Sequence, residues 1–243
     1  MKKYLIASVL AGISVSASAV ETIRFATDAS YPPFEFIDDN NTIQGVDIDV
    51  ANTLCYEMQA KCIFTNQAFD MLIPGLKFKR FDAVIAGLDI TPDRKKQVLF
   101  SNPYFSNSAL FIALKNSVAD ASALKGKKVG VQNGTTHQKY LADKHPEITT
   151  IPYDNYQNAM LDLKNGRVDT VFGDTAVVNE WLIHNKELAT VENKVTDKDY
   201  FGSGLGIALS QTNTELQSKF NAALEKCKQD GTYEILYKKW FEK

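Results

Sequence analysis

Arg94 lies at a point in the chain where an arginine side chain can bind a carboxylate. Residues 83–86 are all apolar and predict a short buried strand, which Gly87 ends. A hydroxyl, a proline and an acid at 91–93 predict the start of a helix, with Arg94 in its first turn. Ligands of open α/β sheets bind beyond the carboxyl ends of strands, and helix starts favour anions. This segment alone is equally consistent with a surface salt bridge.

Asp174 supplies the opposite charge at a second strand end. It follows a predicted strand at 167–173 and precedes a predicted helix. A free amino acid needs a cation for its carboxylate and an anion for its ammonium group, and Arg94 and Asp174 together provide both. Taken singly, Asp174 is explained as well by a role as the N-cap of the helix that follows.

A third group of residues suits a flat cationic side chain. Asp28 follows a predicted strand at 21–27, Tyr31 lies in a predicted turn at 31–34, and a predicted helix at 69–79 begins with Phe69. A guanidinium binds a carboxylate through paired hydrogen bonds and packs against aromatic faces. Singly, Asp28 is also typical of a turn, and both rings are also typical of a hydrophobic core.

The order of predicted elements indicates an α/β protein with two similar halves. Strands and helices alternate along residues 21–90 and again along 128–173, as in doubly wound sheets. The motif L-K-x-x-R-x-D-x-V occurs at 76–84 and again at 163–171. Two lobes that each bring strand ends to one cleft would explain this repeat, with the chain crossing between them near 109–114 and 206–210.

Composition and the first residues predict an exported globular protein. The 243 residues are 44% hydrophobic and 23% charged, and the net charge of −2 gives no reason to expect nucleic-acid binding. Residues 1–19 have a basic start, a short apolar run and an A-x-A cleavage site, which predict a cleaved signal peptide and a mature chain from Val20. No cysteine follows the site, which argues against a lipid anchor, and no other stretch is long enough to span a membrane.

The chain has three cysteines, at 55, 62 and 227. In an exported protein the close pair Cys55 and Cys62 predicts a disulfide, and two cysteines alone are too few for a structural zinc site. Cys227 lies in phase with apolar residues at helical spacing, which predicts a small buried side chain.

Taken together, the motifs of the mature chain resemble the periplasmic solute-binding proteins of polar amino-acid ABC transporters, above all the arginine-binding and lysine/arginine/ornithine-binding members. The motifs are YPPFE at 31–35, GVDIDV at 45–50, C-x6-C at 55–62, FDMLIP at 69–74, DAVIAGLDITPDR at 82–94, NGTTHQKY at 133–140, GDTAVVNEWL at 173–182 and YFG at 200–202.

The resemblance implies a type II periplasmic-binding-protein fold, with two doubly wound lobes joined by two hinge strands. Lobe 1 would comprise residues 20–108 plus 207–243, and lobe 2 residues 109–206. The implied protein is a periplasmic monomer without cofactor or metal. It would bind a cationic L-amino acid, with arginine the first candidate, and deliver it to an inner-membrane ABC permease.

The resemblance also implies a set of ligand-binding residues, which are Asp28, Tyr31, Phe69, Gly87, Asp89, Arg94, Thr135, Thr136, His137 and Asp174. Arg94 and the backbone N–H of Thr136 would bind the α-carboxylate. Asp174, the Gly87 carbonyl and the Asp89 side chain would bind the α-ammonium. The wider family more often has serine or threonine at position 89, whereas arginine binders often have aspartate, and the extra negative charge favours a cationic ligand.

The remaining residues of this set would surround the ligand side chain. Tyr31 and Phe69 would flank it, Asp28 would face its far end, and Thr135 and His137 would line the cleft from the second lobe. Singly, His137 is also typical of a partly exposed helix residue.

Three alternatives stay open at this stage. The ligand can be lysine, ornithine or histidine. The chain can be a dehydratase-like enzyme of the same fold, although each polar candidate already has a binding role and no G-x-S-x-G motif or metal-ligand cluster is present. A sensory ectodomain would need a membrane-spanning segment after Lys243.

Overall fold

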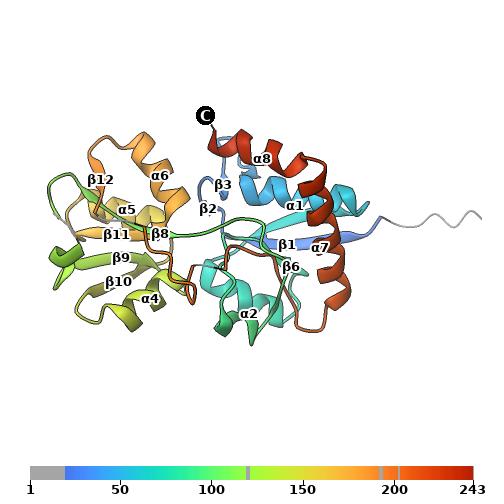
Figure 1. Ribbon diagram of the computed structural model, residues 1–243, viewed down its shortest axis with the longest axis horizontal. Coiled ribbons are helices and arrows are strands. Elements are labelled where there is room, and N and C mark those ends of the chain that lie inside the picture. The colour runs from blue at the N-terminus through green and yellow to red at the C-terminus, as the bar shows by residue number, and fades with distance from the viewer. Residues whose placement is uncertain (1–19, 119–120, 192–193, 202, 243) are drawn as a thin grey trace, which may run out of the picture.

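Two five-stranded sheets, one in each half of the molecule, carry the fold of the computed structural model (Figure 1). The structure describes residues 20–118, 121–191, 194–201 and 203–242. The predicted signal peptide at 1–19 and Gly202 of the YFG motif lie outside the described residues.

The first sheet has the strand order β5-β1-β6-β13-β7, with β1 parallel to both β5 and β6 and with β13 antiparallel to its neighbours. Its strands are β1 (Thr22–Thr27), β5 (Lys61–Asn66), β6 (Ala83–Val84), β7 (Leu99–Phe100) and β13 (Ala208–Leu209). The helical segments of this half are α1 (Val46–Glu57), η1 (Phe69–Met71), α2 (Leu72–Lys77), α3 (Pro92–Lys95), α7 (Thr214–Gln229) and α8 (Thr232–Phe241).

The second sheet has the order β10-β9-β11-β8-β12, with β9 parallel to β10 and β11 and with β8 antiparallel to β11 and β12. Its strands are β8 (Ala109–Leu114), β9 (Lys128–Gln132), β10 (Thr149–Tyr153), β11 (Thr170–Asp174) and β12 (Leu188–Thr190). Its helical segments are η2 (Ala121–Leu124), α4 (Thr136–Lys144), α5 (Tyr156–Lys164) and α6 (Thr175–His184). The predicted two-lobed α/β fold is therefore confirmed.

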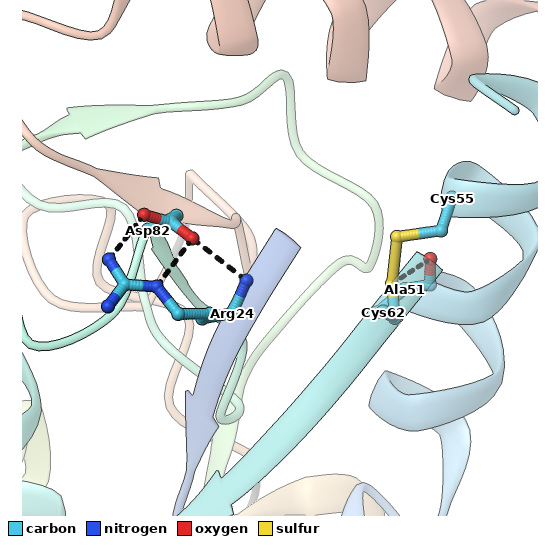
Figure 2. The surroundings of a disulfide bond; sticks show 5 residues. All are labelled: Arg24, Ala51, Cys55, Cys62 and Asp82. Carbon is cyan, nitrogen blue, oxygen red and sulfur yellow. Dashed lines mark hydrogen bonds and ion pairs between the residues drawn. A yellow bond between two sulfur atoms is a disulfide. The ribbon is translucent and has the colours of Figure 1, made fainter. Parts of the chain in front are cut away.

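The repeated motif L-K-x-x-R-x-D-x-V makes the same hydrogen bonds in both lobes. The Asp82 backbone N–H donates to Arg24 O, and the Asp82 carboxylate accepts from the Arg24 N–H at 2.9 Å and from its guanidinium (Figure 2). In the second lobe Asp169 bonds to the backbone of Lys128 in the same way, with both bonds at 2.8 Å. Each motif aspartate thus joins the turn before one inner strand to the neighbouring parallel strand.

The two connections between the lobes run beside each other. All of β8 pairs within the second sheet, so the chain crosses just before Ala109, and it returns just before β13. In these two segments Phe105 pairs with Leu205, and Leu205 also pairs with Asp89. Short paired segments of this kind can bend while they stay paired with each other, as a hinge requires.

Several local predictions differ from the structure. A continuous helix was expected from Phe69, but a 3-10 turn comes first and α2 starts at Leu72. This start leaves Pro74 in the first helical turn, where its missing N–H costs nothing. The small sheet of β2 (Ser30–Tyr31), β3 (Glu35–Ile37) and β4 (Ile43–Gln44) was not predicted, because its strands are too short for a periodic pattern.

The cysteines behave as predicted. Cys55 on α1 and Cys62 on β5 form a disulfide, which joins a helix to the edge strand of the first sheet (Figure 2). Cys227 is buried on α7 among apolar side chains. Within the described residues, no helix has the length and apolar character that a membrane span needs.

We expect the Cys55→Ala/Cys62→Ala double variant to be less stable than the wild type by about 2–3 kcal/mol, because the bond limits the freedom of the unfolded chain. Urea unfolding measures this difference. Cys227→Ala is the matched control, since it removes a buried cysteine that belongs to no disulfide. An unfolding midpoint of the double variant equal to that of the control would show that the bond contributes nothing.

Candidate ligand-binding site

The predicted site residues meet at the joint between the two lobes. A small cavity of about 10 Å³ is bordered by all of the predicted set except Asp28 and Arg94, and those two contact the residues around it. The first lobe contributes the ends of β1 and β6 with η1 and α3, and the second contributes the ends of β9 and β11 with the start of α4. The carboxyl ends of strands from both sheets thus converge, as the sequence predicted.

Arg94 is buried in the first turn of α3. The Thr91 hydroxyl caps this helix by accepting from the Arg94 backbone N–H at 3.2 Å. The guanidinium donates to Asp89 O at 3.0 Å and to Gly134 O of the second lobe at 3.4 Å, and its central carbon lies 5.5 Å from the Phe69 ring centre. A side chain that is 8% exposed and bonded to main-chain carbonyls is not part of a surface salt bridge, so that alternative is wrong.

Asp174 is the last residue of β11, and its carboxylate turns into the cleft. It accepts from the Tyr31 hydroxyl at 2.8 Å and from the Asn107 amide at 2.6 Å, and His137 Nε2 lies 3.2 Å away. Asp174 occupies the N-cap position of α6, but its side chain makes no capping hydrogen bond. The explanation of Asp174 as a simple helix cap is therefore wrong, because its oxygens are used by groups of the cleft.

Asp89 is a second buried acid beside Asp174. Its carboxylate accepts from the Asn107 amide at 2.7 Å and from the Thr136 hydroxyl at 2.6 Å. Burial raises the pKa of Asp89 to about 7, and the neighbouring charge of Asp174 adds to this shift. A cation placed between the two carboxylates would favour the charged form of Asp89.

Asp28 lies at the other end of the site. It accepts from the Ser30 hydroxyl at 2.8 Å and, across the lobes, from the Gln132 amide at 2.5 Å. Burial raises its pKa, although both hydrogen bonds favour the charged form. A buried carboxylate with polar donors on one side and aromatic rings nearby can bind the cationic end of a long side chain.

The aromatic residues form the walls of the site. Tyr31 stacks on Tyr156 of the second lobe, with ring centres 5.0 Å apart. His137 is only 2% exposed, with its ring edge-on to Tyr156 and to Phe172. The alternative of a partly exposed helix residue at position 137 is therefore wrong. Tyr31 and Phe69 both border the small cavity, which places them at the cleft as well as in packing contacts.

Sequence reasoning missed three residues of the site, namely Asn107, Gln132 and Tyr156. Gln132 and Tyr156 border the cavity, and Asn107 bridges the Asp89 and Asp174 carboxylates. A signal for Gln132 was available, because it is the last residue of β9 and ligands bind beyond such strand ends. Asn107 lies in a crossing segment between the lobes, where no pattern points to the site.

Contacts across the joint hold the lobes together. Tyr31 bonds to Asp174, Asp28 to Gln132, and Asp89 to Thr136, each pair taking one residue from each lobe. A cavity of about 10 Å³ is about the size of one water molecule, so an amino acid enters only when these contacts open. A larger cavity of about 850 Å³ lies between α3 and α4, borders Arg94, and shares Thr135 and Thr136 with the small cavity.

The described residues contain no group of three or more histidine, cysteine, aspartate or glutamate side chains arranged to hold a metal ion. The acids of the cleft instead share hydroxyl and amide donors, as described above. The chemistry of this donor set is that of a site for ammonium and guanidinium groups.

Comparison with known proteins defines the class. Residues 23–243 match the family described as bacterial extracellular solute-binding proteins, family 3, and the chain belongs to this family. It is 68% identical over its full length, and the full length of the relative, to a putative ABC transporter arginine-binding protein 2 of Escherichia coli. It is 57% identical to ABC transporter arginine-binding protein 1 of the same organism, with 99% of each chain covered.

Solved structures agree with this class. A periplasmic binding protein of Salmonella typhimurium described as having high arginine specificity aligns with a TM-score of 0.89 and 52% identity, over 91% of this chain and 100% of that one. An ancestral amino-acid-binding protein described as a precursor of cyclohexadienyl dehydratase aligns with a TM-score of 0.82 and 33% identity, over 90% and 95% of the two chains.

We expect Tyr31→Phe to loosen the closed arrangement, because it removes the hydroxyl that reaches Asp174 and keeps the ring on Tyr156. A hydrogen bond to a charged group contributes about 1.5–3 kcal/mol. Small-angle X-ray scattering without added amino acid should give a larger radius of gyration for the variant than for the wild type.

The matched control is Tyr233→Phe, since the Tyr233 hydroxyl donates to Tyr104 O within the first lobe. If both variants had the radius of the wild type, or if the control expanded as much as Tyr31→Phe, the cross-lobe bond would not be what holds the cleft closed.

Proposed function

We propose that this chain binds a cationic L-amino acid in the periplasm, with L-arginine as the preferred ligand, and delivers it to an ABC permease in the inner membrane. The observation that carries the proposal is the placement of Arg94 and Asp174 on opposite lobes of one cleft, with Asp28 and Gln132 at its other end. The arginine-binding relatives described above support the same ligand.

Each part of the ligand has a partner of opposite character. Arg94 and the Thr136 N–H at the start of α4 bind the α-carboxylate, and helix starts favour anions. Asp174, with Asp89 and the Gly87 carbonyl, binds the α-ammonium. These contacts are common to all L-amino acids and provide affinity without selectivity.

Selectivity comes from the far end of the cleft. Asp28 accepts hydrogen bonds from a guanidinium, while Tyr31 and Phe69 cover its flat faces, and Thr135 and His137 close the second lobe around the ligand. A planar guanidinium stacks on rings and bonds in pairs, whereas a lysine ammonium is a compact, strongly hydrated charge. Arginine is therefore preferred, and lysine, ornithine and histidine are the competing ligands.

The remaining parts of the proposal concern processing and organisation. Residues 1–19 serve as a cleaved signal peptide, the mature protein is a monomer, and the lobes comprise 20–108 plus 207–243 and 109–206. The sheets support this division, because β8 to β12 pair among themselves and β1, β5, β6, β7 and β13 do the same. We propose no enzymatic step, since the polar groups of the cleft all have binding roles.

We expect Arg94→Ala to weaken arginine, lysine and glutamine alike, because it removes the partner of a group that all three carry. Loss of one partner of a buried charge pair costs about 2–5 kcal/mol, or roughly 30-fold to several thousand-fold in affinity. Asp28→Asn should weaken arginine and lysine and spare glutamine, since it removes charge at the far end and keeps the shape. Isothermal titration calorimetry measures all three ligands.

Phe69→Leu is the companion variant, and it should cost arginine more than lysine. Unchanged arginine affinity in Asp28→Asn would contradict the role of Asp28, and equal losses for glutamine and arginine in that variant would contradict the division into a common and a selective end. A wild-type chain that binds none of the three would contradict the function itself.

A further inference from the structure

Two buried carboxyl groups, those of Glu35 and Asp47, lie close to the binding site but do not border its cavity. Glu35 on β3 is 1% exposed and Asp47 in the first turn of α1 is fully buried. Both Glu35 oxygens and Asp47 Oδ1 receive no donor from another group of the described chain. The Asp47 backbone N–H donates at 2.9 Å to the carbonyl oxygen of Phe34, the residue before Glu35, so the two acids lie on adjacent segments, and each acts on the pKa of the other. Two carboxylates offer only acceptors, so they bond only if one of them carries a proton.

The other oxygen of Asp47 links this pair to the binding site. Asp47 Oδ2 accepts from the Gly87 backbone N–H at 2.7 Å and from the Tyr104 hydroxyl at 2.9 Å. Gly87 borders the small cavity of the site and has φ of +51°. A residue with a side chain would be strained at this φ, which favours glycine. Because glycine has no side chain to pack, backbone hydrogen bonds hold this turn in position. The Asp47 bond holds the N–H of the residue whose carbonyl we assign to the ligand ammonium.

The surroundings of the pair favour the protonated form of one member. Burial is the main cause that raises the pKa of Glu35 well above its ordinary value, and the charge of Asp47 adds to it. Asp28 beyond β1 and Asp174 at the end of β11 act in the same direction. Asp47 has its pKa raised only to about 6, because Gly87 and its other donors favour its charged form. The proton therefore belongs on Glu35.

We propose that Glu35 and Asp47 share one proton at neutral pH, and that this pair positions Gly87 in the binding site. Glu35 donates to Asp47 Oδ1, and Asp47 Oδ2 bonds to Gly87 and Tyr104. Both acids are positioning residues that do not touch the ligand. The positioning half of this inference rests on the proposed function, whereas the shared proton does not.

The proton makes stability depend on pH with a definite sign. Glutamate in the unfolded chain has an ordinary pKa of about 4.3, and the folded value is higher. The folded protein thus holds more protons, so this group's contribution is fully present below the unfolded pKa and falls as the pH rises towards the folded pKa. Glu35→Gln retains a donor for Asp47 and cannot titrate.

The first test is urea unfolding of wild type and Glu35→Gln without any amino acid, between about pH 5 and about pH 8. As the pH rises, the folding equilibrium constant of the wild type should fall relative to that of Glu35→Gln. The fall should be about tenfold for each pH unit until the pKa of Glu35 in the folded protein is reached. A ratio that stays constant over this range would overturn the shared proton. The loss of a protonated-acid carbonyl band in the infrared spectrum of Glu35→Gln at neutral pH is the second readout, and no loss would likewise overturn it.

The second test measures arginine affinity and separates a bonding role from mere space filling. Glu35→Gln should bind arginine within about threefold of the wild type. Glu35→Met has a side chain of similar length but no donor, and it should bind arginine at least about tenfold more weakly than the wild type. Loss of a hydrogen bond to a charged group weakens binding by that factor or more. Equal affinity in both variants, or equal losses in both, would overturn the positioning role. A wild type that does not bind arginine would overturn this role together with the proposed function, and the unfolding series would still decide the proton.

Discussion

The cleft is governed by the cost of burying negative charge at the joint between the lobes. Asp28, Asp89 and Asp174 are all nearly inaccessible to water, and Arg94 is the buried cation among them. Burial raises the pKa of Asp28 and Asp89 and lowers the pKa of Arg94, so the charged form of each of these three groups is less stable here than in water. A ligand with two positive groups and one negative group relieves this cost better than a neutral one.

The fold brings these charged side chains together at the joint between the lobes. The carboxyl ends of strands from each sheet supply the acids, and the capped first turn of α3 supplies Arg94. The two lobes are built on the same plan, since Asp82 and Asp169 bond equally to neighbouring strands. Two short connections join the lobes, so each lobe can remain rigid while the joint opens.

Much of this arrangement could be predicted from the sequence. The positions of β1 and β6, the disulfide partners and the ten expected residues around the site all came from strand patterns, spacing and family motifs. Such signals exist where a side chain follows a periodic strand or caps a helix, as Arg94 does.

The remainder depends on contacts between distant segments. Asn107 bridges Asp89 and Asp174, which are 85 residues apart in the sequence, and no local pattern encodes that meeting. The Glu35–Asp47 pair is similar, because only the closed fold shows that two acids are buried side by side. The short strands β2 and β3 were missed because two or three residues carry no periodicity.

A crystal structure of the arginine complex would show the direction in which the ligand lies in the cleft. We expect the α-carboxylate on Arg94 and the Thr136 N–H, the α-ammonium between Asp89 and Asp174, and the guanidinium at Asp28 between aromatic rings. A ligand lying in the reverse direction, with its guanidinium on Asp174 and its carboxylate away from Arg94, would contradict this expectation.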